Sequence, residues 1–75
     1  MQNIIDEALE ELANGDAKYG SFDGPKDGVN TIEIEAGELR REIERENKCP
    51  ERTYREAVQV AAMGLKMMRY LKKGC

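Results

Sequence analysis

Apolar residues recur at helical spacing in two segments of the first two thirds of the chain. Residues 1–14 predict a helix that ends at Asn14-Gly15, because Gly accepts the left-handed conformation that ends helices. Residues 29–47 predict a second helix with a narrow apolar seam, and Asn30 with Glu33 would form a capping box at its start. The two apolar sets are Ile4, Ile5, Ala8, Leu9 and Leu12, and then Val29, Ile32, Ala36, Leu39 and Ile43.

A third helix is predicted over residues 50–73, with Pro50 at its first position and Lys72 and Lys73 in its last turn. Its two apolar strips are Tyr54, Val58, Ala61, Leu65 and Met68, and then Val60, Met63, Met67 and Tyr70. They lie on roughly opposite sides of the helix, and one short partner helix cannot cover both. The predicted fold is therefore all-α and a single domain over residues 1–75. We expect a bundle of two to three helices per chain, completed as a homo-dimer or homo-tetramer.

The segment 15–28 is predicted to be the loop between the first two helices. It contains four Gly, one Pro and three Asp, all of which favour turns. Tyr19 and Phe22 are the exceptions in this polar stretch. Either they pack onto the core as plugs, or they offer a stacking surface for a nucleobase.

The composition of the chain bears on the stability of a monomer and on the kinds of molecule that the protein can bind. The chain has 75 residues, no Trp, one Phe and three Tyr, and 36% of its residues are charged, so a monomer would be marginally stable. The net charge of −3 argues against binding to a nucleic-acid backbone, which needs clustered Lys and Arg. It leaves small nucleotides open, because a divalent cation can join carboxylates to phosphates.

Cellular location is inferred from what the chain lacks. Residues 1–14 carry four acidic residues and no basic one, unlike a signal peptide, and no apolar run approaches the ~20 residues of a membrane span. We therefore expect a cytoplasmic protein. Cys49 and Cys75 are interpreted as free thiols in a reducing compartment, and without His a structural zinc site is not expected.

Glutamates follow the edge of the apolar seam in the second helix. Glu35, Glu38 and Glu42 share one face at spacings of three and four, and in the third helix Glu56 and Gln59 begin an apolar strip. Glutamates that face each other across two helices repel unless a divalent ion lies among them. Oxygen ligands suit Mg²⁺ or Mn²⁺.

A plainer interpretation of these residues stays open. Glu56 could reach back to Thr53 in a capping box. The second helix also carries Arg40, Arg41 and Arg45, so its glutamates could form a solvated face with local ion pairs.

Three stretches together resemble the short MazG-like nucleotide pyrophosphohydrolases of phages and bacteria. They are Tyr19-Gly20-Ser21-Phe22, Ile34-Glu35-Ala36-Gly37-Glu38-Leu39 and Arg55-Glu56-Ala57-Val58-Gln59-Val60-Ala61-Ala62-Met63. The resemblance covers about residues 17 to 71, and its last stretch is the most specific. It implies an oligomeric helical bundle in which Mg²⁺ holds a nucleoside triphosphate. Water then cleaves between the α- and β-phosphates.

The same resemblance implies the site residues. Glu35, Glu38 and Glu56 match metal ligands, and Glu38 and Glu56 are the candidates for catalysis. Gln59 stands where the family commonly has Asp, so it would be a neutral ligand. The candidates for substrate contact are Lys18, Tyr19, Phe22, Lys26, Arg55 and Lys66, each of which could instead be plain surface or core.

Three functions remain after this reasoning. The first is Mg²⁺-dependent hydrolysis of a nucleoside triphosphate to its monophosphate and pyrophosphate. The second is capture of a nucleotide, such as a signalling nucleotide, without turnover, in the host cytoplasm if the chain is phage-encoded. The third is a helical module for protein contacts, with an adaptable strip that includes Met63, Met67 and Met68.

Overall fold

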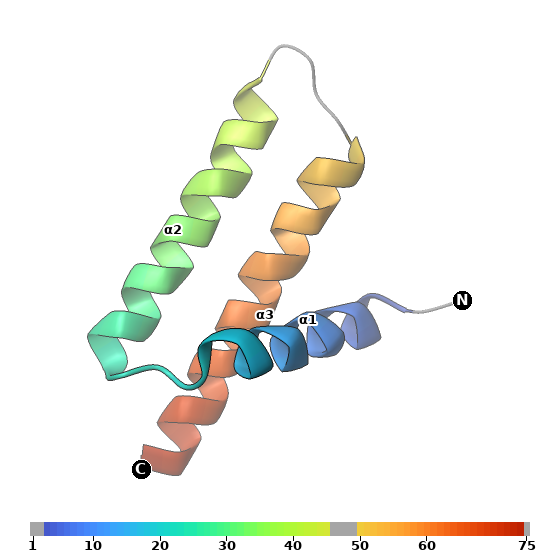
Figure 1. Cartoon of the computed structure of the whole chain (residues 1–75). Helices are drawn as coiled ribbons and strands as arrows, with labels where there is room; N and C mark the ends of the chain where they lie inside the picture. Colours follow the sequence, from blue (N-terminus) through green and yellow to red (C-terminus); the bar gives the residue numbers. More distant parts are fainter. Residues whose placement is uncertain (1–2, 46–49, 75) are drawn as a thin grey trace.

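Three helices make up the part of the chain that the computed structural model describes, residues 3–45 and 50–74. They are α1 (Ile4–Tyr19), α2 (Pro25–Glu44) and α3 (Pro50–Gly74), and the described residues form no strand (Figure 1). The predicted all-α class is therefore confirmed. The expected free thiols of Cys49 and Cys75, and the predicted helix end at Asn47, lie outside the described residues.

α1 begins and ends at residues that pair its terminal backbone groups. At its start, the Oδ1 atom of Asn3 accepts a hydrogen bond from the backbone N–H of Asp6 at 2.8 Å. At its end, Gly20 has a φ of 76° and donates its N–H to the carbonyl of Asp16 at 3.0 Å. The helix end predicted at residues 14–15 is wrong, because the left-handed conformation occurs at Gly20.

α2 begins at Pro25, inside the segment predicted as loop. Proline suits the first helical position, because its fixed φ is helical and it has no N–H to leave unpaired. In the same turn, the Oδ2 atom of Asp27 accepts the backbone N–H of Asp23 at 2.8 Å, which holds the approach to the helix. The connection between α1 and α2 therefore spans residues 20–24, and the predicted loop over 15–28 is too long at both ends.

Gly28 falls in the predicted loop, but in the structure it lies buried inside α2. A Cβ atom at this position would meet the Sδ atom of Met67 and the ring of Phe22, whose Cδ2 atom would be 3.0 Å away. Gly is therefore needed here for close packing between α2, α3 and the loop. The capping box predicted at Asn30 is wrong, because α2 begins at Pro25 and Asn30 lies inside the helix.

α3 is the helix on which the other two pack. α2 and α3 run in opposite directions side by side, and α1 crosses α3 near its middle (Figure 1). Within the described residues, no Cα atom of α1 lies within 8 Å of one in α2. A cavity lies between α1 and α2, lined by side chains of both helices, of α3 and of the connecting loop.

Much of the apolar surface is left uncovered. The buried apolar side chains in the described residues are Ala8, Phe22 and Ala62, and no large side chain is fully buried. The exposed large apolar residues are Ile4, Ile5, Leu9, Tyr19, Val29, Ile34, Ile43, Tyr54, Met68 and Leu71. Pairing of chains, which would cover such surface, stays a prediction. None of the described helices combines the length and the apolar character that a bilayer crossing requires.

Candidate metal centre and adjoining cavity

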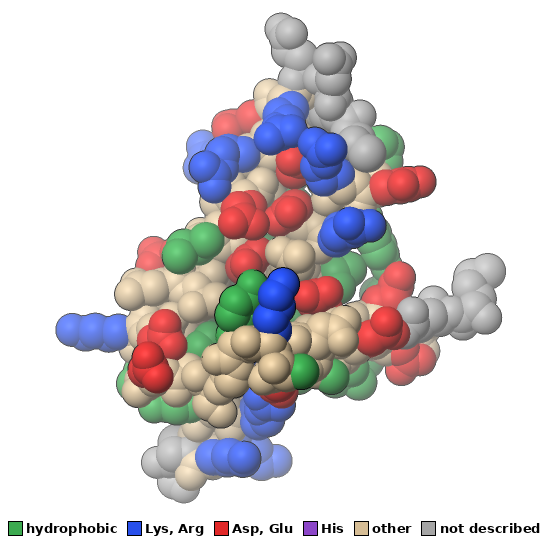
Figure 2. All heavy atoms as spheres, in the orientation of Figure 1, with side chains coloured by type: hydrophobic (Ala, Val, Ile, Leu, Met, Phe, Trp, Pro, Cys, Tyr) green, Lys and Arg blue, Asp and Glu red, His purple; other side chains and the backbone are tan. Residues whose placement is uncertain are grey.

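Three glutamates from two helices come together between α2 and α3. Glu35 and Glu38 lie one turn apart on α2, and Glu56 approaches them from the first half of α3. One carboxylate oxygen from each residue lies within 4.8 Å of the other two, and all three side chains are half-buried. In the space-filling view, acidic side chains gather over the region between these helices (Figure 2). The predicted convergence of these three residues is confirmed.

Burial and mutual repulsion disfavour the charged forms of two of these carboxyls. Burial is the largest cause that raises the pKa of Glu35, followed by the charges of Glu38 and Glu56. Burial also raises the pKa of Glu56, together with a hydrogen bond to Glu38 and the charge of that neighbour. Both effects stabilise the proton-bound carboxyl over the ion. A cation among the three would act in the opposite direction.

The donor atoms fit a divalent cation. The Oε2 atoms of Glu35 and Glu56 are buried and have no hydrogen-bond partner, which costs free energy that a ligand would recover. Mg²⁺ and Mn²⁺ satisfy several carboxylate oxygens at once, whereas zinc prefers nitrogen and sulfur donors. The ligand set here is oxygen only. A site of this kind would leave further coordination positions for water or phosphate.

Gln59 and Glu42, which the sequence analysis groups with the three glutamates, differ in what they can contribute. Gln59 lies one turn beyond Glu56 on α3, where it is half-buried and lines the same cavity as Glu35. Its amide oxygen is therefore available beside the triad without adding charge. Glu42 is buried and pairs with Arg45 across 3.5 Å. The arginine therefore balances the charge of this carboxylate without a metal.

Of the two plainer interpretations of the glutamates, the solvated face with local ion pairs holds in part and the capping box does not. Arg40 pairs with Glu44 at 3.4 Å on the exposed side of α2, as a solvated face predicts. The capping box between Thr53 and Glu56 is wrong, because α3 begins at Pro50 and Thr53 already lies inside the helix.

A cavity of about 760 Å³ adjoins the triad and shares Glu35 with it. All three helices and the connecting loop contribute to its lining. Five residues singled out from sequence line it together: Lys18, Tyr19, Phe22, Gln59 and Lys66. Its volume is in the range of pockets that hold small molecules. The structure thus brings most of the predicted substrate-binding residues to one place beside the candidate metal site.

Lys66 is the most buried basic side chain among the described residues, with 6% of its side chain exposed. Its Nζ atom lies 3.9 Å from Oδ1 of Asp16 and 4.7 Å from the centroid of the Phe22 ring. A surface role for this lysine is therefore wrong. An ammonium group held in low-dielectric surroundings, between a ring and a carboxylate 3.9 Å away, can also attract an anion that enters the cavity.

The two loop aromatics have different environments. Phe22 is buried and packs edge-on against Tyr70, with 6.3 Å between ring centroids, so its prediction as a plug is confirmed. Tyr19 keeps 76% of its surface exposed, with the Nζ atom of Lys18 5.5 Å from its ring centroid. The plug interpretation is wrong for Tyr19, and its open ring face remains suited to stacking.

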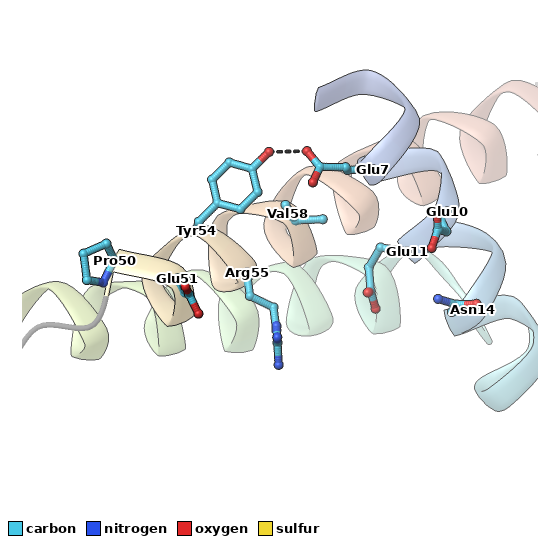
Figure 3. Close-up of a pocket in the computed structure, with 9 residues that line it drawn as sticks. All are labelled: Glu7, Glu10, Glu11, Asn14, Pro50, Glu51, Tyr54, Arg55 and Val58. Atoms are coloured by element: carbon cyan, nitrogen blue, oxygen red, sulfur yellow. Dashed lines mark hydrogen bonds between the residues drawn. The ribbon is translucent and has the colours of Figure 1, made fainter. Parts of the chain in front are cut away.

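Arg55 and Lys26 lie apart from the other candidates. Arg55 lines a second cavity, of about 530 Å³, formed by α1 and the start of α3 (Figure 3). In that cavity the hydroxyl of Tyr54 donates a hydrogen bond to Glu7, and Glu10, Glu11 and Glu51 also line it. Lys26 is exposed at the start of α2 and lines neither cavity.

Sequence reasoning missed an ion pair that positions Lys66. Arg69 donates to both carboxylate oxygens of Asp16 at 2.8 Å, and Asp16 also faces Lys66. The pair joins the last turn of α1 to α3 and so holds one wall of the cavity. No local pattern signals a pairing between residues 53 positions apart.

Comparisons of the chain with models of protein families, with curated proteins and with solved structures find no match. The triad and the cavity are therefore the features of the chain that bear on its function.

Proposed function

We propose that the chain is a Mg²⁺-dependent nucleoside triphosphate pyrophosphohydrolase of the kind that the MazG-like resemblance implies. The observation that carries the proposal is the shared position of Glu35. This residue belongs to the acidic triad and also lines the cavity that holds Lys18 and Lys66. A cation bound by the triad and a triphosphate bound in the cavity would therefore be in contact.

The metal ligands in this proposal are Glu35, Glu38 and Glu56, with the amide oxygen of Gln59 beside them. The two orphan carboxylate oxygens support this assignment, because they lack any other partner. When bound, Mg²⁺ or Mn²⁺ would polarise the phosphates and lower the pKa of a coordinated water.

Different residues of the cavity would contact the phosphates and the base of the nucleotide. Lys66 offers a buried positive charge to a phosphate, and Lys18 adds a second one near the rim. Tyr19 presents an exposed ring on which a base can stack. Phe22 supports Lys66 from the core and does not contact the base.

Hydrolysis needs a water that attacks the α-phosphorus while the bond to the bridging oxygen of the pyrophosphate breaks. Glu38 and Glu56 are the candidates to accept the proton of that water. Burial and the neighbouring Glu38 raise the pKa of Glu56, which makes its carboxylate a better proton acceptor than an exposed one. The products are a nucleoside monophosphate and pyrophosphate.

A second candidate function is nucleotide capture without turnover. It is favoured by Gln59, whose side chain is neutral at the position next to the triad. Three carboxylates and an amide carry less negative charge than four carboxylates. The smaller charge weakens the binding of a second metal and the activation of a water.

One incubation series separates these functions. The protein is mixed with ribo-, deoxyribo- and cyclic nucleotides in Mg²⁺, released by heat, and the nucleotides are separated by chromatography. We expect monophosphate and pyrophosphate in equal amounts from one or more triphosphates. Intact nucleotide that is depleted from solution and recovered after heating would indicate capture instead.

Matched variants tie the result to the site. Glu35→Gln and Glu56→Gln should abolish turnover, whereas Glu33→Gln on the exposed side of α2 should leave it unchanged. Turnover that survives both site variants, or a protein that neither binds nor converts any nucleotide, would contradict the proposal and leave the protein-contact module.

A further inference from the structure

Glu11 of α1 lines both of the cavities described above. In the larger one it lies with Glu35 and Gln59, and its side chain is half-buried. In the close-up, the side chain of Glu11 leaves α1 toward the ribbon of α2, whereas that of Glu7 leaves it toward Tyr54 (Figure 3). A carboxylate of α1 therefore reaches the space beside the acidic triad.

Two contacts between α1 and α3 fix the level of Glu11 along α3. On one side of Glu11, Glu7 accepts the hydrogen bond from the hydroxyl of Tyr54. On the other side, a Cβ atom added at Gly15 would lie 3.9 Å from the Cε atom of Met63. Glu11 is about one helical turn from each of Glu7 and Gly15. It therefore lies opposite the middle of the α3 segment between Tyr54 and Met63.

The middle of that segment contains Gln59, which is one turn beyond Glu56 on α3. Gln59 is neutral, whereas Glu11 brings a negative charge to the same level of the cavity. The charge of Glu11 is among the causes that raise the pKa of Glu35, which requires the two carboxylates to be close. Glu11 is thus a fourth carboxylate at the edge of the triad.

The carboxylate of Glu11 has no partner among the described residues. It takes part in none of the ion pairs or side-chain hydrogen bonds that these residues form. The buried Oε2 atoms of Glu35 and Glu56 have no hydrogen-bond partner either. Carboxylates that are partly buried, repel one another and lack donors are stabilised by a divalent cation.

The position of Glu11 suits contact with such a cation through water. One oxygen each of Glu35, Glu38 and Glu56 lies within 4.8 Å of the other two, and Glu11 is not part of this group. Mg²⁺ keeps several of its waters when a protein binds it. A carboxylate that accepts a hydrogen bond from such a water lies about 5 Å from the ion, outside the ring of direct ligands.

We propose that Glu11 accepts a hydrogen bond from a water on the cation that Glu35, Glu38 and Glu56 hold, and that α1 thereby supplies a fourth negative charge to the metal centre. Glu11 is a positioning residue, because it acts on the cation through the water. Carboxylates in such outer positions orient the groups bound to a metal and strengthen its binding. The inference rests on the metal centre of the proposed function and adds α1 to it, at the level where Gln59 brings no charge.

Binding of Mn²⁺ to the full chain tests the role of Glu11, with the free ion counted by electron paramagnetic resonance. Glu11→Gln should weaken the affinity for Mn²⁺ at least about tenfold. The control is Glu10→Gln, which changes the charge of α1 equally but lines only the second cavity, and it should bind Mn²⁺ as wild type does. Glu11→Gln combined with Gln59→Glu returns a fourth carboxylate to the same level and should restore the affinity.

A loss of folding would not give this pattern. Without metal, Glu11→Gln should melt no lower than wild type, because the change removes a charge that repels Glu35. Recovery of Mn²⁺ affinity by a carboxylate at position 59 depends on charge beside the triad and not on packing of α1.

Glu35→Gln separates the failure of this inference from the failure of the proposed function. If Glu35→Gln loses Mn²⁺ and Glu11→Gln binds it as wild type does, the metal centre stands and the role of Glu11 is overturned. An equal loss in Glu11→Gln and Glu10→Gln would overturn it too, since the general field of α1 would explain both. If wild type does not bind Mn²⁺, or binds it equally well after Glu35→Gln, the metal centre fails and this inference fails with it.

Discussion

Arg69 donates two hydrogen bonds, both of 2.8 Å, to the carboxylate of Asp16, and this ion pair fastens α1 to α3. Arg69 holds the pKa of Asp16 below its ordinary value of 3.8, mainly through the hydrogen bond. A carboxyl whose pKa is lowered by folding binds fewer protons in the folded state. The stability it contributes is therefore complete above that ordinary value and is lost as the pH falls through the folded value.

Arg69→Gln should lower the free energy of unfolding at pH 7 by about 1 kcal/mol or less, since both side chains are partly exposed and screened. The difference from wild type should shrink as the pH falls below the ordinary pKa of Asp16. Urea unfolding of both proteins from pH 7 down to pH 3 measures this difference in the free energy of unfolding. Arg40→Gln is the control, because its pair with Glu44 is largely exposed and should contribute little. A difference that grows in acid would show that Arg69 acts in another way.

Gly28→Ala should destabilise the fold even though Ala is the better helix former. The new methyl group would meet Met67 and the Phe22 ring, and overpacking of this kind costs about 1–3 kcal/mol. Gly37→Ala in the same helix meets nothing within 4 Å and should stabilise by about 0.5–1 kcal/mol. Thermal melts of the two variants should shift in opposite directions. A shift of both to higher temperature would mean that Met67 and Phe22 move aside at no cost.

Divalent ions should stabilise the wild-type fold through the acidic triad. At a Mg²⁺ concentration of about a hundred times the dissociation constant, the gain is about 2.7 kcal/mol. Glu35→Gln and Glu56→Gln should lose this gain while melting no lower than wild type without metal, because each removes a repelling charge. Melts with Mg²⁺ and with a chelator measure it, with Glu33→Gln as the control. Equal metal stabilisation in all four proteins would place the ion elsewhere.

Nucleotide affinity should depend on Tyr19 and Lys66 in separable ways. Tyr19→Ala removes an exposed ring and should weaken binding about tenfold, the value of one stacked base, with no loss of thermal stability. Lys66→Met keeps the buried shape and removes the charge. The affinity for triphosphates should therefore fall more than the affinity for the corresponding nucleosides.

Isothermal titration of triphosphate and nucleoside into each variant makes this comparison. Tyr54→Phe, in the second cavity, is the control and should bind as wild type does. If Tyr54→Phe weakened binding and Tyr19→Ala did not, the nucleotide would belong to the second cavity.

Helical periodicity predicted three helices correctly, because residues three and four apart share a helix face whatever the surrounding fold. The same spacing placed Glu35 and Glu38 on one face and set Glu56 beside an apolar strip. Helix ends were harder to predict. Gly15 and Gly28 both resemble turn residues in sequence. Among the described residues, however, only Gly20 has a positive φ, and Gly28 is required by packing.

Sequence by itself determined the helical class and the shared face of Glu35 and Glu38, since both follow from local spacing, and the family resemblance added Glu56 to this pair. Tertiary structure decided that Phe22 is buried while Tyr19 is exposed, that Arg55 lies away from the cavity, and that Lys66 lies inside it. These outcomes depend on how α1 crosses α3, which the Asp16–Arg69 pair helps to set. A contact between residues 53 positions apart leaves no periodic trace in the chain, so only the folded arrangement reveals it.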